Sequence, residues 1–293
     1  MPSGPDWLVI AGAAAAAVIA LALAAAAVRR QTIREPDDYT TALLLLLIRV
    51  YARVVHRVRF EGLEHAPRAV RDEDGVWRPA EPVILAPVHT AGVDPLLIQT
   101  GLRYEVRWMM AADMREPILE PLWTHARIIF VDRGRSSSEP VRTAVRHVRT
   151  GHALGVFPEG HIERPPRHLL PFREGIGFLV RRTGAAVLPV VIEGTPQADP
   201  AWASLWRPSA SRVRFLPPVR YDKGLSPEEI AGDIRRRIAD ATGWPMTDRA
   251  PIFAGGRRVT VDLDGRYVDE SGREVSDAEV AALRAGAGSE SDL

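Results

Sequence analysis

The chain has 293 residues, of which 46% are hydrophobic, and its 38 Lys+Arg against 37 Asp+Glu leave a net charge of +1. This composition excludes a disordered chain and argues against a strongly basic nucleic-acid-binding protein. Cysteine is absent from the sequence, which excludes disulfides, thiolate nucleophiles and cysteine-bound zinc. Lys223 is the one lysine, so the basic charge is almost entirely guanidinium, which suits bidentate contacts to phosphate or carboxylate.

Residues 1–34 are predicted to form an N-terminal transmembrane anchor. The stretch 7–28 carries no charge, and its length as a helix, about 33 Å, matches a hydrocarbon core of about 30 Å. A helix buried in protein is the alternative, because the stretch is rich in alanine. Arginine or lysine does not precede it, which argues against a cleaved signal peptide. Because Arg29, Arg30 and Arg34 follow it, the positive-inside rule predicts a single-pass protein of the inner or plasma membrane with everything after residue 28 in the cytoplasm.

Residues 35–60 are predicted to form an amphipathic helix at the membrane interface. Apolar residues between positions 44 and 58 recur at helical spacing, while Arg49, Arg53 and Arg57 repeat every four residues. Such an arginine face suits an anionic lipid surface. The periodicity fits a helix packed on the protein core equally well, and the nearby anchor favours lipid.

Residues 61–245 predict an α/β domain with a mostly parallel central sheet flanked by helices, because short apolar runs alternate with helical patterns. The remainder, 246–293, predicts a C-terminal extension with a small hairpin around Asp264-Gly265 and a short helix starting at Ser276. The expected strands of the domain are 82–88, 127–131, 153–157, 186–192 and 213–216, and its expected helices are 94–101, 136–149, 175–182 and 226–241.

His89 and Asp94 are candidate catalytic residues. His89 follows the strand 82–88, and Asp94 comes five positions later in the sequence HTAGVD. A histidine accepts a proton near neutral pH when a carboxylate holds its ring, and ligands of open α/β sheets bind at the carboxyl ends of strands. The alternative is structural: Asp94 caps the helix that Pro95 opens, and His89 is a loop residue.

Two more clusters of polar residues follow predicted strands. After the strand 153–157 a turn would place a glutamate and backbone amides at the sheet edge, where they can contact hydroxyls or an anion. After the strand 127–131 an arginine could clamp a phosphate. The alternatives are a solvated turn and an ordinary surface arginine. The candidate residues are Phe157, Pro158, Glu159, Gly160 and Arg133.

Taken together and in order, these blocks resemble the membrane-bound glycerolipid acyltransferases of the lysophosphatidic-acid (1-acylglycerol-3-phosphate) acyltransferase type. HTAGVD at 89–94 resembles the family's His-x4-Asp motif, and IIFVDRGR at 128–135 its second block. FPEG at 157–160 resembles the third block and VLPVVIEG at 187–194 the fourth. The likeness extends over about residues 58–221.

The resemblance implies that His89 deprotonates a hydroxyl of a lysophospholipid, which then attacks an acyl thioester, while Asp94 orients the imidazole. It implies no metal and no cofactor, with acyl-CoA or acyl-acyl carrier protein as co-substrate and 1-acylglycerol-3-phosphate as the first candidate acceptor, in phospholipid biosynthesis. Membrane lipids, and no nucleic acid, are the implied partners. The implied substrate-binding residues are Arg133, Glu159 and Gly160, with Phe157 and Pro158 in the same block.

The sequence departs from the family pattern directly after FPEG. The family commonly has Thr-Arg-Ser there, and this chain has His161-Ile162-Glu163, so Arg164 or Arg167 would have to replace the missing arginine. The acceptor head group is therefore open. A serine hydrolase is the second hypothesis, although the sequence contains no Gly-x-Ser-x-Gly, and a non-catalytic lipid-binding protein is the third. A metal enzyme is disfavoured because the sequence contains no His-Glu-x-x-His.

Overall fold

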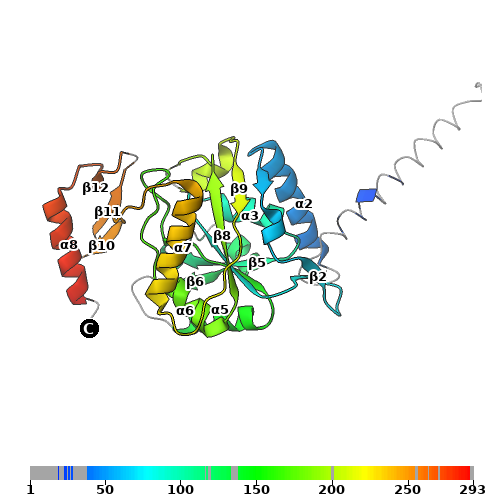
Figure 1. Cartoon of the computed structure of the whole chain (residues 1–293). Coiled ribbons are helices and arrows are strands. Elements are labelled where there is room, and N and C mark those ends of the chain that lie inside the picture. The colour runs from blue at the N-terminus through cyan, green and yellow to red at the C-terminus, as the bar shows by residue number, and fades with distance from the viewer. Residues whose placement is uncertain are drawn as a thin grey trace, which may run out of the picture.

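The protein, as a computed structural model, is described at residues 19, 23, 24, 26, 28, 38–115, 117, 120–132, 138–198, 201–254, 257–262, 264–269 and 271–290. Its centre is a seven-stranded sheet in the order β1-β9-β8-β4-β7-β5-β6 (Figure 1). The strands are β1 (Arg59–Glu61), β4 (Val83–Pro87), β5 (Val106–Ala111), β6 (Ile129–Val131), β7 (Ala153–Gly155), β8 (Ala186–Glu193) and β9 (Arg212–Phe215).

Neighbouring strands from β8 to β6 run parallel, and β9 is antiparallel to β8. The predicted α/β class with a mostly parallel sheet is confirmed. All five residues of β4 are buried, which explains why its sequence is an uninterrupted apolar run rather than an alternating one. The carboxyl ends of the parallel strands therefore meet at one edge, where the residues after β4 and β7 come together.

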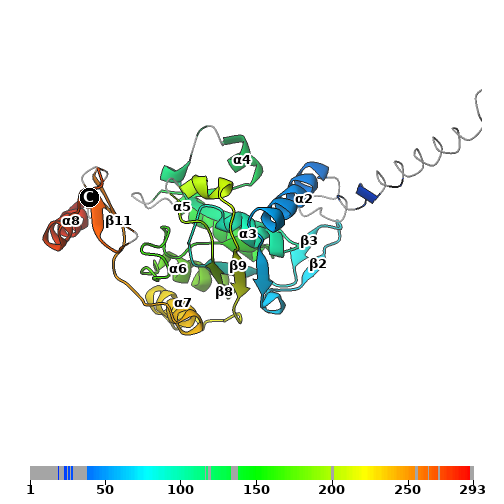
Figure 2. The ribbon, with the colours of Figure 1, turned by 90° about the horizontal axis from the view of Figure 1, so that it is seen from above.

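Helices cover both faces of the sheet. The helices α5 (Ser138–Arg149), α6 (Gly175–Thr183) and α7 (Pro227–Thr242) pack on one face, and α2 (Tyr39–Val54) and α3 (Asp94–Gly101) on the other. Figure 2 shows α2 and α3 on one side of the sheet and α6 and α7 on the other. Ser226 and Glu229 form the capping box that starts α7, as the sequence predicts, and Gly243 ends this helix with φ 70°.

Smaller elements extend this core. The stretch 68–79 is a hairpin of β2 (Ala69–Arg71) and β3 (Trp77–Pro79), and α4 (Glu120–His125) precedes β6. The predicted C-terminal hairpin is present as β11 (Arg257–Val261) and β12 (Tyr267–Asp269), which β10 (Ile252–Ala254) extends to three strands. The helix α8 (Asp277–Glu290) packs on them around a separate small apolar cluster. Short 3-10 helices are η1 (Leu63–His65), η2 (Ala112–Met114) and η4 (Ala201–Trp206).

Of the arginine face predicted for the helix at 35–60, Arg53 is exposed in the last turn of α2, whereas the prediction is wrong for Arg49 and Arg57, which bind backbone carbonyls. The Nη2 of Arg49 donates to the carbonyl of Leu102 at 2.7 Å and its Nε to that of Thr100 at 3.3 Å. These carbonyls lie at the end of α3, where a helix leaves its last carbonyls without internal partners and attracts cations. Arg57 lies beyond the end of α2, and its Nε donates to the carbonyl of Ser209 at 2.9 Å.

The exposed side of α2 is aliphatic instead. Four side chains at positions i, i+4, i+7 and i+11 are between 48% and 69% exposed, and we call them the aliphatic stripe: Leu43, Leu47, Val50 and Val54. The buried side of α2 consists mainly of small residues, which allow a close approach to α3: Thr41, Ala42, Leu45 and Ala52. An exposed row of large apolar side chains is typical of a contact surface.

Within the described residues no helix is long and apolar enough to cross a bilayer. Most of the stretch 7–28, where the anchor is predicted, lies outside those residues. The transmembrane anchor therefore stays a prediction.

Candidate active site

His89 and Asp94 meet at the carboxyl edge of the sheet. His89 follows the end of β4, and Asp94 is the first residue of α3. The Nδ1 of His89 lies 3.0 Å from the Oδ2 of Asp94. The Asp94 side chain is fully buried, whereas the His89 side chain is 16% exposed. The turn 89–94 thus places a buried carboxylate behind an imidazole that reaches solvent.

Asp94 is held by the turn that carries His89. Its carboxylate accepts hydrogen bonds from the backbone amides of Thr90 at 2.7 Å and Ala91 at 2.8 Å, and from the Thr90 hydroxyl at 3.1 Å. The Thr90 hydroxyl lies 2.6 Å from that of Thr195. Because an ionised carboxylate only accepts hydrogen bonds, the His89 Nδ1 carries the proton that faces Asp94. Nε2 is then the basic nitrogen.

The capping role considered for Asp94 is wrong. The cap residue of α3 is Val93, whose side chain makes no capping hydrogen bond, and Asp94 lies inside the first turn. Its carboxylate turns back to the loop because three donors of residues 90–91 converge there. The structural alternative for this motif, in which Asp94 serves the helix alone, loses its support.

Two aromatic rings fix the plane of the imidazole. His89 stacks on Phe157 with ring centroids 4.0 Å apart and an angle of 24°, and Phe157 stacks on Trp108 at 5.2 Å and 19°. A Cβ at Gly155 would lie 2.3 Å from the Trp108 ring, so this ring position requires glycine in β7. Phe157 thereby supports the ring of His89, and its role in substrate binding stays a prediction.

Glu159 connects three segments behind His89. Its side chain is buried, its Oε1 accepts from the His89 amide at 3.0 Å, and its Oε2 accepts from the Leu170 amide at 3.1 Å. Burial raises the pKa of Glu159 well above its usual range, against the lowering effect of the His89 amide. This glutamate supports the catalytic loop, and a direct contact to substrate stays a prediction.

The FPEG turn lies beside Arg173, for which the sequence predicts no role. Gly160 has φ 69°, and a Cβ there would lie 2.8 Å from the Nε of Arg173. The carbonyl of Pro158 accepts from the Arg173 amide at 2.9 Å. The Arg173 side chain is exposed next to the turn. The contact spans thirteen positions of chain, so only the fold reveals it. Arg133 lies outside the described residues.

Glu163, where the sequence departs from the family pattern, belongs to the site. Its amide donates to the carbonyl of His89 at 2.7 Å, and its Oε1 accepts from the amide of Arg167 at 2.9 Å. Its Oε2 is buried without a hydrogen-bond partner among the described residues. Burial, reinforced by the charge of Asp94, raises the pKa of Glu163 to about 8. We therefore expect this carboxyl to be mostly protonated at neutral pH.

The arginines proposed as substitutes near Glu163 differ in their placement. The Nη1 of Arg164 donates to the carbonyl of Glu163 at 2.8 Å and also to the Oε1 of Gln197, whose amide donates to the carbonyl of Thr90 at 3.0 Å. Arg164 therefore stabilises the loops around the site. Arg167 is exposed.

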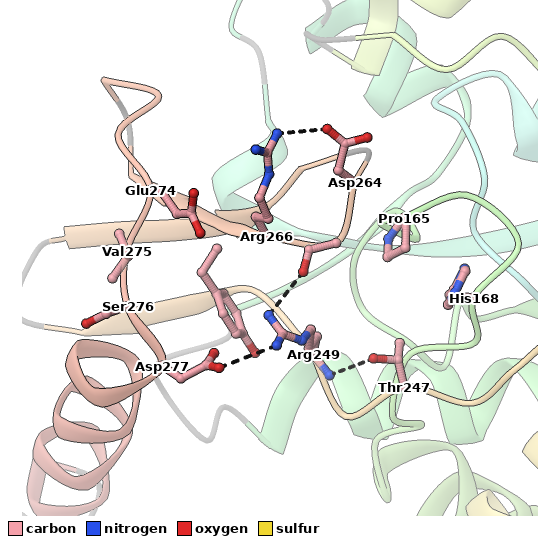
Figure 3. A pocket seen from close by; sticks show the side chains of 12 residues that line it. Pro165, His168, Thr247, Arg249, Asp264, Arg266, Glu274, Val275, Ser276 and Asp277 are labelled. Atoms are coloured by element: carbon pink, nitrogen blue, oxygen red, sulfur yellow. Dashed lines mark hydrogen bonds and ion pairs between the residues drawn. The ribbon is translucent and has the colours of Figure 1, made fainter.

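A cavity of about 520 Å³ lies elsewhere, where the C-terminal hairpin meets residues Pro165 and His168 (Figure 3). The Nη1 of Arg249 donates to the carbonyl of Gly265 at 3.1 Å, and its Nη2 is 3.5 Å from Asp277. Neither His89 nor Asp94 lines this cavity. Within the described residues, no group of three or more His, Asp or Glu side chains is placed to hold a metal ion.

Comparison with known proteins agrees with this geometry. The sequence profile of the family described as Acyltransferase matches residues 57–193, which include the His89–Asp94 pair and the FPEG turn. This stretch of the chain, a little under half of its length, is therefore similar to that acyltransferase family. The resemblance that the motifs indicate, to acyltransferases of the lysophosphatidic-acid type, is confirmed.

Curated relatives of the acyltransferase domain carry one name. The 1-acyl-sn-glycerol-3-phosphate acyltransferase of Limnanthes douglasii is 31% identical over 141 residues, which are 47% of this chain and 44% of that protein. The protein of the same name from Borreliella burgdorferi is 30% identical over 116 residues, which are 39% of this chain and 46% of that protein. The chain thus matches less than half the length of these relatives.

A solved structure shares the fold. The 1-acyl-sn-glycerophosphate (LPA) acyltransferase PlsC from Thermotoga maritima has a TM-score of 0.55 and 21% sequence identity, with 72% of this chain and 83% of that chain covered. At this identity the likeness supports the arrangement of sheet and helices alone.

Proposed function

We propose that this acyltransferase moves a fatty acyl chain from an acyl thioester to a hydroxyl of a lysophospholipid. The observation that carries the proposal is the His89 Nδ1 bonded at 3.0 Å to a fully buried Asp94, which makes Nε2 the basic nitrogen at the carboxyl edge of the sheet. A histidine held in this way is suited to general-base catalysis.

The reaction needs one proton acceptor and no covalent enzyme intermediate. His89 Nε2 takes the proton of the acceptor hydroxyl while the hydroxyl oxygen forms a bond to the carbonyl carbon of the thioester. The tetrahedral intermediate collapses, the C–S bond breaks, and the imidazolium returns the proton to the departing thiolate. Asp94 stays ionised throughout and stabilises the imidazolium, because four hydrogen-bond donors surround its carboxylate.

The first candidate acceptor is 1-acylglycerol-3-phosphate, in agreement with the names of the relatives. Its phosphate needs a cation near the FPEG turn, where this chain has Ile162 in place of the family's arginine. Arg173 is exposed beside Gly160 and can supply a bidentate guanidinium contact. Another lysolipid head group that offers an anion would fit the same residue.

The enzyme would act at a membrane, where its acceptor and product reside. The aliphatic stripe of α2 supports this placement, since it exposes four large apolar side chains. The predicted anchor at 7–28 precedes this helix in the chain. Membrane attachment with a cytoplasmic catalytic domain is part of the proposal, and so is the use of acyl-CoA or acyl-acyl carrier protein as donor.

An acyl-transfer assay of the purified full chain tests the proposal. Lysolipids with phosphate, phosphoglycerol and phosphocholine head groups are each offered with acyl-CoA and with acyl-acyl carrier protein. We expect transfer to the phosphate-bearing acceptor, and we expect His89→Ala to abolish it. Arg173→Gln should raise the KM for this acceptor. Arg220→Gln is the control and should change the KM little, because Arg220 is an exposed arginine between β9 and α7. Thioester hydrolysis that proceeds equally without acceptor would instead support a hydrolase.

A further inference from the structure

Two tryptophans are exposed on the short helix η4. Trp202 is 51% exposed and Trp206 is 77% exposed. Large aromatic side chains gain most of their stabilising free energy by burial, so two exposed rings within one six-residue helix are typical of a contact surface. This pair differs from the isolated exposed apolar residues that any protein surface carries.

The segment that carries Trp206 is bound to the end of α2. The hydroxyl of Tyr51 donates to the carbonyl of Leu205, and the amide of Ser209 donates to the carbonyl of Val55 at 3.1 Å. Leu205 and Tyr51 pack on the same apolar cluster, and Figure 2 shows the yellow-green η4 on the α2 side of the sheet. Trp206 therefore lies next to the C-terminal end of the aliphatic stripe.

The same helix rests on the catalytic loop. A Cβ at Gly92 would lie 2.5 Å from the carbonyl oxygen of Ala201, so the backbone of η4 is in direct contact with the turn between His89 and Asp94. Upstream of η4, Gln197 donates to the carbonyl of Thr90 at 3.0 Å. A partner that binds η4 would therefore also be positioned relative to the loop that carries His89.

The charges around the tryptophans favour an anionic lipid surface. Residues 201–211 contain one charged side chain, the exposed Arg207. The charged side chains of α2 are the exposed Arg53 and Arg49, which binds carbonyls of α3. Because neither segment has an acidic residue, a second copy of this surface would offer these arginines no opposite charge. Tryptophan rings accumulate at the head-group level of bilayers, and arginine is attracted by anionic lipids.

The predicted anchor at 7–28 would keep this surface near the bilayer. Residues 29–38 connect the end of the predicted anchor to the first residue of α2. Ten extended residues span at most about 35 Å, so the predicted anchor would hold the start of α2 within that distance of the membrane. A surface tethered this closely meets lipid at high effective concentration.

We propose that Trp202 and Trp206 form a second membrane contact, in which both rings enter the head-group region of an anionic bilayer. This inference rests on the proposed function, because it supplies the means by which His89 reaches an acceptor held in the membrane. The aliphatic stripe and η4 then touch the same bilayer from two segments of the chain, and the catalytic loop is fixed between η4 and the sheet.

A spectroscopic experiment tests the contact itself. Because the sequence has no cysteine, Trp202→Cys, Trp206→Cys and Phe178→Cys each create one site for an environment-sensitive label. Phe178 is the matched control, since it is 39% exposed on α6, which packs on the opposite face of the sheet. The full chain is reconstituted in phosphatidylethanolamine–phosphatidylglycerol vesicles that carry a head-group quencher. We expect several-fold stronger lipid quenching at 202 and 206 than at 178, and protection of both from aqueous iodide.

Equal quenching at the three positions, or iodide access at 206 as high as at 178, would overturn the proposal. Quenching that is the same in purely zwitterionic vesicles would overturn its preference for anionic lipid. Protection of the labels without lipid quenching would show that protein covers the surface instead.

A kinetic experiment tests the consequence. In Trp202→Ser/Trp206→Ser the apparent KM for a long-chain lysolipid in vesicles should rise several-fold, whereas kcat and KM for a short-chain lysolipid below its micellar concentration should stay at wild-type values. Phe178→Ser should change neither. An equal loss on both acceptors would show that the rings act on the catalytic loop itself, and a loss seen only with acyl carrier protein as donor would indicate a protein-docking surface.

The two proposals fail in different ways. If the wild-type protein transfers no acyl group, the proposed function is wrong, and the quenching experiment still decides whether η4 meets lipid. If the wild type transfers acyl groups and the labels stay in water, the second membrane contact alone is wrong.

Discussion

Glu163→Gln is expected to stabilise the protein more strongly as the pH rises. The side chain of Glu163 is buried, and one carboxyl oxygen has no hydrogen-bond partner among the described residues. The charged groups that face it are Asp94 and Glu159, which disfavour its ionisation, and Arg164 and Arg167, which favour it. Burial is the largest cause of the rise of its pKa from 4.5 to about 8. Glutamine has the same shape, stays neutral, and keeps an oxygen for the Arg167 amide.

The sign and size of this effect follow from the proton bound in each state. Below pH 4.5 both the folded and the unfolded chain hold the proton, and above pH 8 both release it. Between these values only the unfolded chain is ionised, so the wild-type free energy of unfolding falls by about 1.4 kcal/mol per pH unit. Over 8 − 4.5 = 3.5 units the loss reaches about 5 kcal/mol. Glu163→Gln removes this loss.

Urea unfolding of wild type and Glu163→Gln in mild detergent, followed by circular dichroism from pH 5 to pH 9, measures the difference. The gap between the two free energies should widen steadily with pH up to about pH 8 and then stay constant. Glu228→Gln is the control, because Glu228 is an exposed glutamate at the start of α7, and it should run parallel to wild type. A gap between wild type and Glu163→Gln that does not depend on pH would show that the folded protein carries a charged Glu163, and the account of this loop would be wrong.

The remaining predictions concern the catalytic turn and α2. His89→Ala should lower the rate of acyl transfer by about 10² to 10⁴-fold while circular dichroism stays that of wild type, since His89 serves as a base; activity within a few-fold of wild type would remove it from the mechanism. Asp94→Asn should lose roughly 10⁴-fold in kcat. The side-chain amide of Asn would place a donor against the backbone amides of Thr90 and Ala91, and it would favour the tautomer of His89 that carries its proton on Nε2. A wild-type kcat would contradict this. Gly92→Ala should cost about 1–3 kcal/mol in a urea titration, because its Cβ would lie 2.5 Å from the Ala201 carbonyl oxygen; an unchanged midpoint would mean that η4 yields. Arg49→Gln should cost about 1–3 kcal/mol, since it leaves the carbonyls of Thr100 and Leu102 without their guanidinium partner; unchanged stability with weaker vesicle binding would restore the arginine face.

The sequence predicts those elements whose signals are local. The apolar runs of β4 and β8 and the capping box of α7 each lie within a few consecutive residues, and their predicted positions agree with the structure within a few residues. The strand β5 was missed because its sequence VRWMMA mixes an arginine with residues that are half-buried. The direction of β9 is set by its pairing with β8 and leaves no local pattern.

In the candidate site, too, the local features could be predicted from the sequence and the long-range contacts could not. The spacing of His89 and Asp94 is local and places both in one turn, whereas the support of this turn comes from distant residues. Glu159 and Glu163 lie about seventy positions from His89 and bind its backbone amide and carbonyl. Periodicity likewise placed Arg49 on an outer face, since the α3 carbonyls that bind it are about fifty positions away.

The turn that carries His89 is held in part by buried glutamates whose desolvation lowers the stability of the fold. Two glutamates whose burial opposes their ionisation hold the turn on one side, and η4 closes it at Gly92. Desolvated carboxyls would be unfavourable in an ordinary loop. Here the Glu159 carboxylate accepts from the amide of His89 and the Glu163 amide donates to its carbonyl, so the imidazole keeps one orientation toward Asp94. A preorganised base of this kind needs no rearrangement when the acceptor arrives, which lowers the barrier of the transfer step. The change from Thr-Arg-Ser to His161-Ile162-Glu163 therefore alters the support of His89 as well as the proposed head-group contact, and both should be measured together when the acceptor is identified.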